Sequence, residues 1–579
     1  MLLLGLEAAM LGLEGTDQHS QVRRLTPSDG DEGHSAWPTK PNVVLWLVDD
    51  QGWGNAGLHN DNVLTPQMDR LATEEGAVLK RHYTYPWCAP SRSALMTGIM
   101  PHLGLQSDGQ RIPESVVMLP QVMKAAGYST HHIGKWHLGM LRTWQHPTGR
   151  GFDTSLGFMN GGEDYETQIV GAGEKGIDWG CEGIDFLENA TPALGKNGTF
   201  SSTWIHSELS RVVHQDSATP LFLFVALQAM HSPSPGPERL AGAVDKYAAA
   251  GIADTRFAET NALITMADEL LADAVELLRE TNRWDNTLLI HLSDNGGQVT
   301  DTKGTSPPPP PGDPWASQGN NWPLRGMKRS FFEGGVRVPA FVTGGALPST
   351  MRGATLSGYI HLADWFLTIA ELAGSDQVPS RHGSMSMAGF LGGTRGSPRS
   401  GIVLGAGDTA STCNHNEAVI EGDWKLINGS IPCEWATWQA PLFPNASAST
   451  STESRLKQDT KTQPNECVLQ DTTFLFNIKD DPNEQVNLAA SSPKRVHFLL
   501  TKLVEARADA QTDPFERNHD HAVHDRAALC TAYRDAHGGF LGPYMEGRLV
   551  EEVARIEESR VRDPDPLAFA SPDTYTDEC

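Results

Sequence analysis

The sequence predicts an α/β protein, in which helices cover both faces of a large, mostly parallel sheet and a smaller antiparallel domain follows. Three apolar runs support the sheet: NVVLWLVDD (42–50), PLFLFVALQAMHSP (220–233) and NTLLIHLSDNGG (286–297). Each run ends in polar or charged residues, which is typical of buried parallel strands whose carboxyl ends face a site. An amphipathic segment at 262–282 predicts the helix that connects the last two runs.

Other segments supply the remaining elements. SVVMLPQVMKAAGY (115–128) has helical spacing, and STHHIGKWHLG (129–139) predicts the next strand and its loop. From about residue 400 the apolar runs shorten, which favours short antiparallel strands with a closing helix at about 494–509. We therefore divide the chain into a polar leader without regular structure (1–40), a main domain (41–400) and a smaller domain (401–579). The proline-rich segment 306–314 is a stiff insertion outside the sheet.

The 579-residue chain carries 45 Lys and Arg against 71 Asp and Glu, a formal net charge of −26. A field of this sign repels nucleic acid, and no basic stripe offsets it, so we expect no nucleic-acid partner. It also repels anionic substrates, unless lysines and arginines gather locally. No apolar run is long enough to span a membrane.

Signals for the cellular compartment are weak. The start, MLLLGLEAAMLGLEG, lacks a positive region, and Glu7 and Glu14 interrupt its apolar run, so it is a poorly formed signal peptide. Four Asn-x-Ser/Thr sequons begin at Asn189, Asn197, Asn428 and Asn445. They favour, weakly, a glycoprotein of the secretory pathway that is lysosomal or extracellular. Seven cysteines allow one or two disulfide bonds.

Two pairs of oxygen-bearing side chains end matching strands: Asp49 with Asp50, and Asp294 with Asn295. Either pair alone is more often a solvated loop or a helix cap, but two pairs at matching strand ends favour a shared site. Like charges in one site oppose ionisation unless a cation is present. Three carboxylates and one amide oxygen are hard ligands that suit Ca²⁺ or Mg²⁺, and the set lacks the His or Cys expected for zinc.

Basic side chains also stand at strand ends. Lys135 and His137 are two residues apart, so in an extended segment both point to the same face. His231 follows another apolar strand run. Alone, Lys135 and His137 are better explained as a surface lysine and a structural histidine of an ordinary loop, and a lone histidine such as His231 is more often structural than catalytic.

Lys328 lies in NWPLRGMKRSFFEGG (321–335), a local basic cluster with Arg325, Arg329 and Arg337 in an acidic chain. On its own, this segment is typical of a solvated basic loop, although the flanking Trp, Phe and Gly residues favour a constrained one. Together with the acidic set, the lysines and histidines predict a metal-assisted site for a tetrahedral oxyanion. The lysines would neutralise the anion and the histidines would move protons.

Cys88 lies in WCAPSRSALMTG (87–98) and is the candidate nucleophile of that site. Arg92 is a plausible neighbour to lower the pKa of its thiol, although a structural, buried cysteine is an equally open interpretation. A thiolate is a poor partner for Ca²⁺, which conflicts with the hard oxygen set. The residues alone leave this mismatch unresolved.

The stretch Cys88-Ala-Pro-Ser-Arg92 followed by SALMTG resembles the sulfatase signature, in which the cysteine is oxidised to formylglycine (3-oxoalanine). GKWHLG (134–139) is similar to the second sulfatase signature. The resemblance runs from about residue 41 to 545 and is closest to the arylsulfatase B (N-acetylgalactosamine-4-sulfatase) type. Four segments carry this subgroup resemblance: RGFDTSLGFMNGGEDY, LFLFVALQAMHSP, NNWPLRGMKRSFFEGGVR and LFNIKDDPNEQVNL.

The resemblance implies an alkaline-phosphatase-like fold and calcium-dependent hydrolysis of sulfate esters on sugars or aryl groups. It implies that the metal ligands are Asp49, Asp50, Asp294, Asn295 and the modified residue 88. Arg92 and His137 would hold the hydrated aldehyde, Lys135 and Lys328 would bind sulfate, and His231 would protonate the leaving alcohol. A formylglycine-generating enzyme would act on Cys88 during maturation.

Three features depart from the subgroup. Ala89 stands where many eukaryotic members have Thr or Ser, and the proline-rich insertion separates two site segments. Cys413 and Cys433 match one disulfide of the subgroup, whereas Cys530 has no cysteine near Met118 to pair with. Two other functions stay open: a phosphodiesterase or phosphonate hydrolase of the same superfold, and an inactive protein that binds sulfated glycans.

Overall fold

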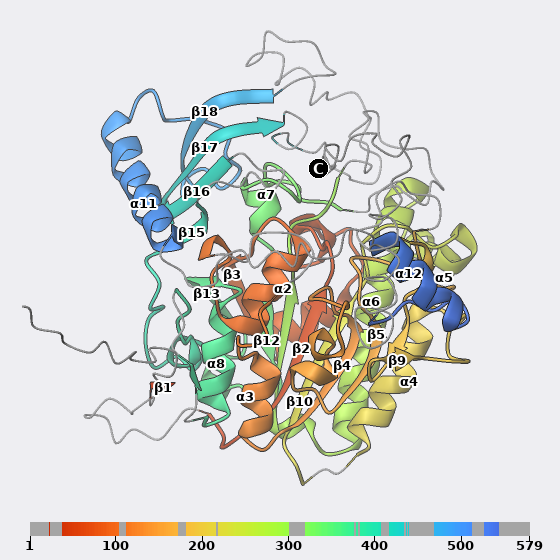
Figure 1. The fold of residues 1–579 in the computed structure, drawn as a ribbon. Helices are drawn as coiled ribbons and strands as arrows, with labels where there is room; N and C mark the ends of the chain where they lie inside the picture. The colour runs from red at the N-terminus through yellow and green to blue at the C-terminus, as the bar shows by residue number, and fades with distance from the viewer. Residues whose placement is uncertain are drawn as a thin grey trace, which may run out of the picture.

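A ten-stranded mixed sheet forms the centre of the computed structural model (Figure 1). The structure describes residues 22–23, 37–103, 112–171, 181–215, 218–299, 319–375, 378–379, 383–406, 416–432, 436, 438, 468–511 and 526–543. The strands of this sheet are β2 (Asn42–Val48), β3 (Ala77–Tyr83), β4 (Ser129–Lys135), β5 (Thr154–Phe158), β8 (Leu187–Glu188), β9 (Thr191–Pro192), β10 (Leu221–Leu227), β11 (Thr287–Ser293), β12 (Phe341–Thr343) and β13 (Ala354–His361).

The strand order is β13-β3-β12-β11-β2-β10-β4-β5-β8-β9. The central strands β11, β2, β10, β4 and β5 are parallel, as the sequence predicts for the three apolar runs. Strands β12, β8 and β9 are antiparallel to their neighbours and make the sheet mixed. All seven side chains of β2 are buried, which explains why its sequence is continuously apolar rather than alternating.

Helices cover both faces of the sheet. They are α1 (Pro66–Thr73), α2 (Cys88–Thr97), α3 (Leu119–Ala125), α4 (Ser201–Val213), α5 (Pro237–Ala249), α6 (Thr255–Glu280), α7 (Glu333–Val336), α8 (Asp364–Leu372) and α9 (Ala388–Leu391). On one face α2, α3 and α8 share a core with Val43, Leu45 and Leu47 of β2 (Figure 1). On the other face α1, α4, α5 and α6 pack against Val44, Trp46 and Val48. Successive side chains of β2 therefore point alternately into two hydrophobic cores, one on each face of the sheet.

Short elements connect these helices and strands. The 3₁₀ helices are η1 (Trp53–Asn55), η2 (Pro101–Leu103), η3 (Thr143–Gln145), η4 (Thr148–Arg150), η5 (Trp284–Asn286) and η6 (Ser349–Met351). Two small strand pairs are β6 (Ile169–Val170) with β7 (Gly183–Ile184) and β1 (Val22–Arg23) with β14 (Val378–Pro379). The expectation that residues 1–40 lack regular structure is therefore wrong at Val22 and Arg23, which gain backbone pairing from a distant segment.

A four-stranded antiparallel sheet follows, as predicted, from β15 (Gly401–Gly405) through β16 (Asn416–Glu421), β17 (Trp424–Pro432) and β18 (Val468–Asn477). The predicted closing helix is α11 (Pro493–Gln511), and its Leu499 and Leu503 pack on one face of this sheet. On the opposite face, Phe474 and Phe476 of β18 join the main core next to Phe332. The small sheet is therefore packed directly against the segment that carries Lys328.

The last described helix, α12 (Arg526–Ala536), is joined to the main domain by a disulfide bond between Cys181 and Cys530. Cys530 therefore has no partner near Met118, as expected, and pairs instead with a cysteine that is far away in the sequence. The predicted Cys413–Cys433 pair and the proline-rich segment 306–314 lie outside the described residues, although the hairpin between those cysteines is present as β16 and β17.

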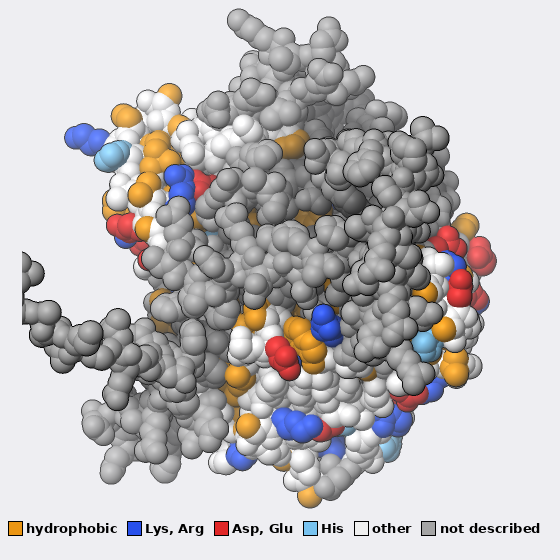
Figure 2. All heavy atoms as spheres, viewed as in Figure 1, with side chains coloured by type: hydrophobic (Ala, Val, Ile, Leu, Met, Phe, Trp, Pro, Cys, Tyr) orange, Lys and Arg blue, Asp and Glu red, His pale blue; other side chains and the backbone are white. Residues whose placement is uncertain are grey.

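Charged side chains of both signs are scattered over the described part of the face in Figure 2, and acidic groups gather at the edge where α5 lies. Within the described residues, no helix combines the length and the apolar character needed to cross a membrane.

Candidate active site

The register of the central strands brings the predicted site residues to one edge of the sheet. Val48, the last residue of β2, is level with Leu227 of β10 and Ser293 of β11. Asp49 and Asp294 therefore leave their strands at the same height, and the Asp294 amide donates to the Val48 carbonyl. His231 follows β10, and Lys135 is the last residue of β4. Side chains from the ends of four strands therefore lie at the same edge of the sheet.

Three carboxylates converge at this edge. One oxygen each from Asp49, Asp50 and Asp294 lie within 4.8 Å of one another, and all three side chains are buried. Asp50 has a left-handed backbone (φ 55°), and its amide donates to Asp294 Oδ1 over 3.2 Å. The unusual backbone turns the chain sharply after β2, so that adjacent Asp49 and Asp50 both face the site.

Each carboxylate has a buried basic partner. Lys135 Nζ lies 2.5 Å from Asp49 Oδ2, and Lys328 Nζ lies 2.7 Å from Asp50 Oδ1. The guanidinium of Arg92 donates to Asp294 Oδ2 over 2.9 Å and to the Lys135 carbonyl. Buried charges need such partners, because an isolated charge in the interior costs several kcal/mol.

The donor set fits a hard divalent cation. Asn295 Nδ2 donates to Asp50 Oδ1 over 2.6 Å, which turns the amide toward the carboxylates. Asn295 Oδ1 and Asp49 Oδ1 are buried and accept no hydrogen bond from the described residues. Buried oxygens without a donor are costly. Two such oxygens beside three carboxylates therefore suit Ca²⁺ or Mg²⁺.

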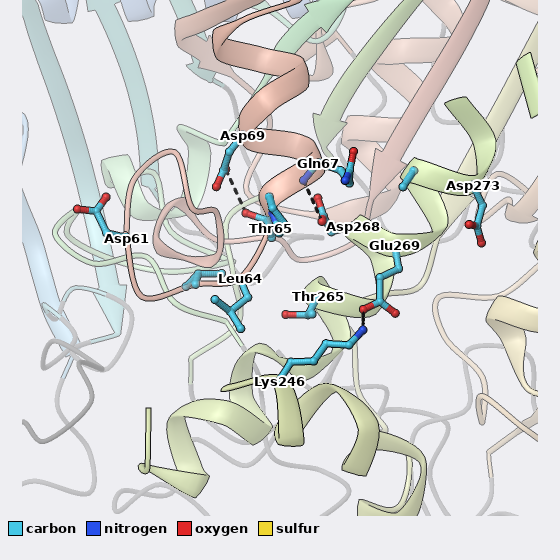
Figure 3. A pocket seen from close by; sticks show the side chains of 13 residues that line it. Asp61, Leu64, Thr65, Gln67, Asp69, Lys246, Thr265, Asp268, Glu269 and Asp273 are labelled. Carbon is cyan, nitrogen blue, oxygen red and sulfur yellow. Dashed lines mark hydrogen bonds and ion pairs between the residues drawn. The ribbon is translucent and has the colours of Figure 1, made fainter. Parts of the chain in front are cut away.

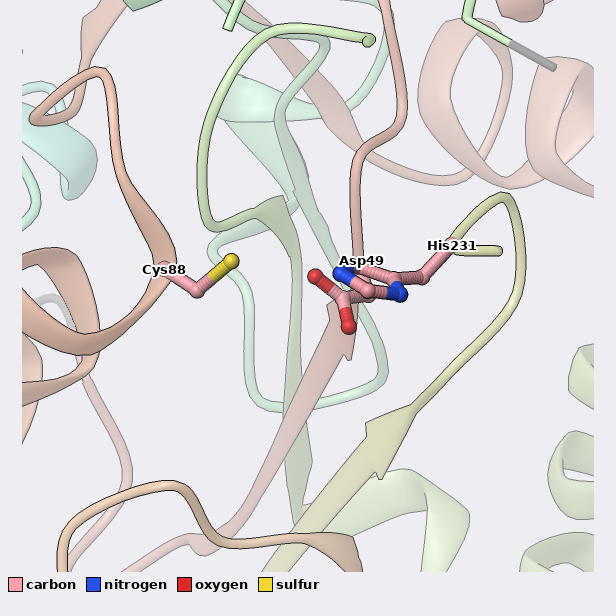
Figure 4. A group of neighbouring side chains, drawn as sticks. All are labelled: Asp49, Cys88 and His231. Carbon is pink, nitrogen blue, oxygen red and sulfur yellow. The ribbon is translucent and has the colours of Figure 1, made fainter. Parts of the chain in front are cut away.

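Cys88 is the first residue of α2, and its sulfur points across the site toward Asp49 and His231 (Figure 4). One ligand atom each from these three residues lie within 4.8 Å of one another. Burial raises the pKa of the Cys88 thiol, but the Lys135 and Lys328 charges outweigh burial and bring the pKa below its ordinary value. The two lysines, rather than the expected Arg92, are the main cause, because Arg92 bonds directly to Asp294.

The two candidate histidines follow different strands, His137 after β4 and His231 after β10. His137 lies close enough to Cys88 to lower the pKa of its thiol, and it reaches this position through a left-handed backbone (φ 58°). The expectation of an extended segment at His137 is therefore wrong, because β4 ends at Lys135, although both side chains still reach Cys88. His231 Nδ1 contacts the Ser232 carbonyl over 2.6 Å, which leaves Nε2 available to the site. Burial and the Lys328 charge lower the pKa of His231.

The carboxylates differ in their protonation. Burial and the neighbouring charge of Asp294 raise the pKa of Asp49 to about 7, despite its contact with Lys135. For Asp50, burial acts in the same direction, but the charges of Lys328 and His231 together outweigh it and lower the pKa. For Asp294, the charges of Arg92, Lys135 and Lys328 together outweigh burial and lower the pKa. With no cation bound, one of the three acids therefore holds a proton near neutral pH.

The basic residues around Lys328 do not all lie at the carboxylates of the candidate site. Arg325 donates to the Ala436 carbonyl and stacks on Phe332 and Trp438, away from the carboxylates. Arg337 donates to the Lys80 carbonyl. Of these three residues, Lys328 alone contacts a site carboxylate. The segment is buried and constrained, so the solvated-loop interpretation is wrong.

Sequence reasoning missed a turn that separates the two histidines. A Cβ atom on Gly161 would lie 3.1 Å from the His137 ring, and one on Gly162 would lie 2.9 Å from His231 Nδ1. Tyr165 donates through its hydroxyl to the His231 carbonyl over 3.0 Å. The paired glycines of GGEDY were the available signal, because adjacent glycines mark a close backbone approach.

A separate cavity of about 530 Å³ lies between α1, α5 and α6 and is not lined by any of the predicted site residues (Figure 3). Its wall includes Asp268, which accepts hydrogen bonds from the amides of Gln67 and Met68 at the start of α1. The Lys246–Glu269 ion pair crosses its rim. The bonds to Asp268 join α1 to α6, and the ion pair joins α5 to α6. The cavity is distinct from the site at the strand ends.

Comparison with known proteins identifies the family. The sulfatase family model matches residues 41–375, which is more than half of the chain. Mouse (Mus musculus) arylsulfatase J is 32% identical over 499 residues, covering 82% of this chain and 76% of that protein. Human N-acetylgalactosamine-6-sulfatase is 29% identical, covering 59% of this chain and 64% of that protein. This chain belongs to the sulfatase family, and its reaction class is sulfuric ester hydrolysis.

Solved structures agree with the fold. The crystal structure of Ps i-CgsB has a TM-score of 0.62 at 22% identity, covering 86% of this chain and 100% of that one. The PsFucS1 sulfatase from Pseudoalteromonas sp. has a TM-score of 0.60 at 23% identity, covering 82% and 91%. The fold is therefore alkaline-phosphatase-like, as expected.

Proposed function

We propose that this protein is a calcium- and formylglycine-dependent sulfatase that removes sulfate esters from sugars. The observation that carries the proposal is the convergence of Cys88, three carboxylates and three buried basic side chains at one sheet edge. A divalent cation added to this balanced set would leave excess positive charge, which favours an anionic substrate.

Asp49, Asp50, Asp294 and Asn295 would hold the cation, together with residue 88. When bound, the cation would supply charge stabilisation for a sulfate oxygen and for the attacking group. Lys135 and Lys328 would neutralise the sulfate oxygens, since both reach the carboxylate cluster and lie near Cys88. Their present ion pairs fix the ammonium groups before substrate arrives, which reduces the reorganisation that binding requires.

Residue 88, once converted to formylglycine, would supply a hydrated aldehyde with one oxygen for attack on sulfur and a second whose deprotonation expels sulfate. Arg92 and His137 would orient this residue. The effect of His137 on the pKa of the Cys88 thiol and the buried Arg92–Asp294 pair support those roles. A thiol has a single sulfur and no hydroxyl group, so it cannot take both roles, and conversion of Cys88 is part of the proposal.

His231 would donate the proton that the leaving alcohol needs. Burial and Lys328 lower the pKa of this histidine in the empty site. A bound sulfate monoester brings negative charge close to the imidazole and opposes the Lys328 effect, so substrate binding would promote protonation of His231. The acid would then be charged when the substrate is present.

A sulfated sugar is the substrate class we favour. The relatives include an N-acetylgalactosamine-6-sulfatase, and Ps i-CgsB was solved in complex with k-i-k-neocarrahexaose. The sequence resemblance to the arylsulfatase B type suggests a 4-sulfated N-acetylgalactosamine instead. Hydrolysis of matched 4- and 6-sulfated sugars decides between these positions.

The maturation route follows from the chemistry of residue 88. A formylglycine-generating enzyme would act on the Cys88–Arg92 segment in the secretory pathway. The Cys181–Cys530 disulfide supports an oxidising compartment, and we propose a lysosomal or extracellular destination. The domain division remains part of the proposal, with a catalytic domain at 41–400 and a smaller domain at 401–579.

The deciding experiment combines mass and activity. Protein made in cells that contain the converting enzyme is digested, and the peptide with residue 88 is weighed and treated with an aldehyde-reactive hydrazide. We expect labelling of this peptide and hydrolysis of nitrophenyl sulfate, both absent in Cys88→Ala. An unmodified thiol in protein from its native source would reject the proposed function.

A further inference from the structure

Asp185 lies between β7 and β8 and is fully buried, 0% exposed, although it is absent from the predicted site. Its carboxylate accepts hydrogen bonds from the Met159 amide over 3.0 Å and from the Asn160 amide over 2.7 Å. The Asn160 side-chain amide donates to the same carboxylate over 2.7 Å. A single carboxylate thus holds three N–H groups of one turn, and charged acceptors make such bonds strong.

That turn, residues 159–163, is the one that contacts both candidate histidines. The Met159 carbonyl accepts the His137 amide over 3.2 Å, so the turn fixes the backbone of His137 directly. Gly161 packs against the His137 ring and Gly162 against His231 Nδ1. The Asp185 charge also interacts electrostatically with His137. Its influence therefore reaches residue 88, because His137 lies close to that side chain and lowers the pKa of the Cys88 thiol.

Asp185 is itself held from two sides. Its amide donates to the Gln168 carbonyl over 2.9 Å, next to the β6–β7 pair. The preceding residue, Ile184, exchanges backbone hydrogen bonds with Gly539 and Leu541 after α12. The Cys181–Cys530 disulfide joins the same two segments. Covalent and backbone contacts therefore fix the position of Asp185 relative to the sheet.

We propose that Asp185 is a positioning residue that sets the placement of both His137 and His231 through the 159–163 turn. This inference rests on the proposed sulfatase function for its kinetic consequences, but the hold of Asp185 on the turn is a property of the protein alone. His137 acts on residue 88 with every substrate, whereas His231 matters most for a basic leaving group. Loss of the contact with His137 should therefore slow every substrate, whereas loss of the contact with His231 should slow mainly substrates with a basic leaving group.

The test compares Asp185→Asn with Asp153→Asn in mature enzyme, normalised to its formylglycine content. Asp153 accepts the Thr130 amide over 2.9 Å at the opposite end of β5, so it is a capping carboxylate remote from the histidines, although more exposed. Asp185→Asn should lower kcat about 10–100-fold on nitrophenyl sulfate, as loss of a supporting carboxylate does elsewhere. KM should change less than about twofold, because Lys135 and Lys328 are untouched. Asp153→Asn should leave kcat unchanged.

Amide hydrogen exchange provides a readout that does not depend on activity. The peptide containing residues 159–163 should exchange faster in Asp185→Asn and at the wild-type rate in Asp153→Asn. Wild-type exchange and kcat in a folded Asp185→Asn protein would overturn the inference, as would an equal kcat loss in Asp153→Asn. If the wild type itself has no sulfatase activity, the proposed function fails, while the exchange comparison still tests Asp185.

Gly162→Ala tests the second connection, even if Asp185→Asn does not fold. The added Cβ would lie 2.9 Å from His231 Nδ1 and must displace it, while every Asp185 hydrogen bond remains. Hydrolysis of a sugar sulfate should fall more than that of nitrophenyl sulfate. Equal losses on both substrates, or no loss on either, would show that the turn does not place His231.

Discussion

Lys135 Nζ lies 2.5 Å from Asp49 Oδ2, and neither side chain is exposed to solvent. The lysine is therefore fixed between a proposed metal ligand and residue 88, rather than extended freely from the end of β4. This pairing lets one ammonium group balance an acidic cluster and also face an incoming anion. The following predictions depend on such shared contacts.

Removal of calcium should lower both activity and thermal stability, because three buried carboxylates lose their cation. With calcium at about 100 times its Kd, binding contributes about 2.7 kcal/mol, or roughly 2–4 °C in Tm. Asp294→Asn should abolish this calcium-dependent shift in a thermal melt. Asp285 is an exposed acid in η5, just before β11, so Asp285→Asn is the matched control and should keep the shift. An unchanged Tm after exhaustive chelation would contradict the metal assignment.

Calcium affinity should depend on pH. Burial and Asp294 raise the pKa of Asp49 to about 7 in the metal-free protein, and the cation binds the carboxylate form. Below pH 7 each bound ion must displace a proton, so affinity falls about tenfold per pH unit, whereas above pH 7 it levels off. Calorimetry in buffers of different ionisation enthalpy measures the released proton. An affinity that stays constant between pH 5 and 8 would show that Asp49 is already ionised.

His231→Ala should slow a sugar sulfate far more than nitrophenyl sulfate. A sugar alkoxide is strongly basic and needs a proton as the S–O bond breaks, whereas nitrophenolate hardly does. General acid catalysis contributes about 10²–10⁴-fold, so the sugar substrate should lose rate on that scale, provided chemistry limits both reactions. Equal losses with intact folding would remove His231 from this role.

Lys425→Met should destabilise the contact between the small sheet and the main domain. Lys425 Nζ lies 2.8 Å from Glu333 Oε1 and 3.0 Å from Glu484 Oε1, and all three side chains are fully buried. Breaking a buried ion pair by removing one partner costs about 3–5 kcal/mol. Urea unfolding measures the loss, which should shrink at low pH as the carboxylates become protonated.

Lys479→Met is the control for that variant. Lys479 and Asp423 form an exposed pair in the same domain, with nitrogen and oxygen 3.7 Å apart. Exposed pairs contribute about 0–1 kcal/mol, so the control should unfold almost as the wild type does. Similar losses in both variants would mean that the buried network contributes little.

Non-reducing peptide mapping should link Cys181 to Cys530 and Cys413 to Cys433. The first bond closes a loop of 349 residues. Disulfides typically contribute about 2–4 kcal/mol, with larger contributions for longer loops in the chain-entropy treatment. The double variant Cys181→Ser/Cys530→Ser should therefore melt below the wild type. A free Cys530 in the native protein would contradict the structural pairing.

Much of the fold and the composition of the candidate site could be predicted from the sequence. The apolar run at 42–50 and the acids that end it indicate a buried strand and its polar end, because both features depend on neighbouring residues. Patterns of neighbouring residues likewise predicted α6 and the second pair of oxygen-bearing side chains, Asp294 with Asn295. Cys88 was assigned its chemistry from a short contiguous signature.

Tertiary structure alone decided the contacts between distant segments. Cys530 pairs with Cys181, Asp185 supports the turn beside His137, and Lys425 bridges two glutamates from other segments. None of these residues stands out in its own stretch of sequence. Local patterns of apolar and polar residues determine which elements form and which face is buried. The partners of a buried charge or thiol depend instead on the register and packing of elements that are separated in the sequence, and so they appear only in the folded chain.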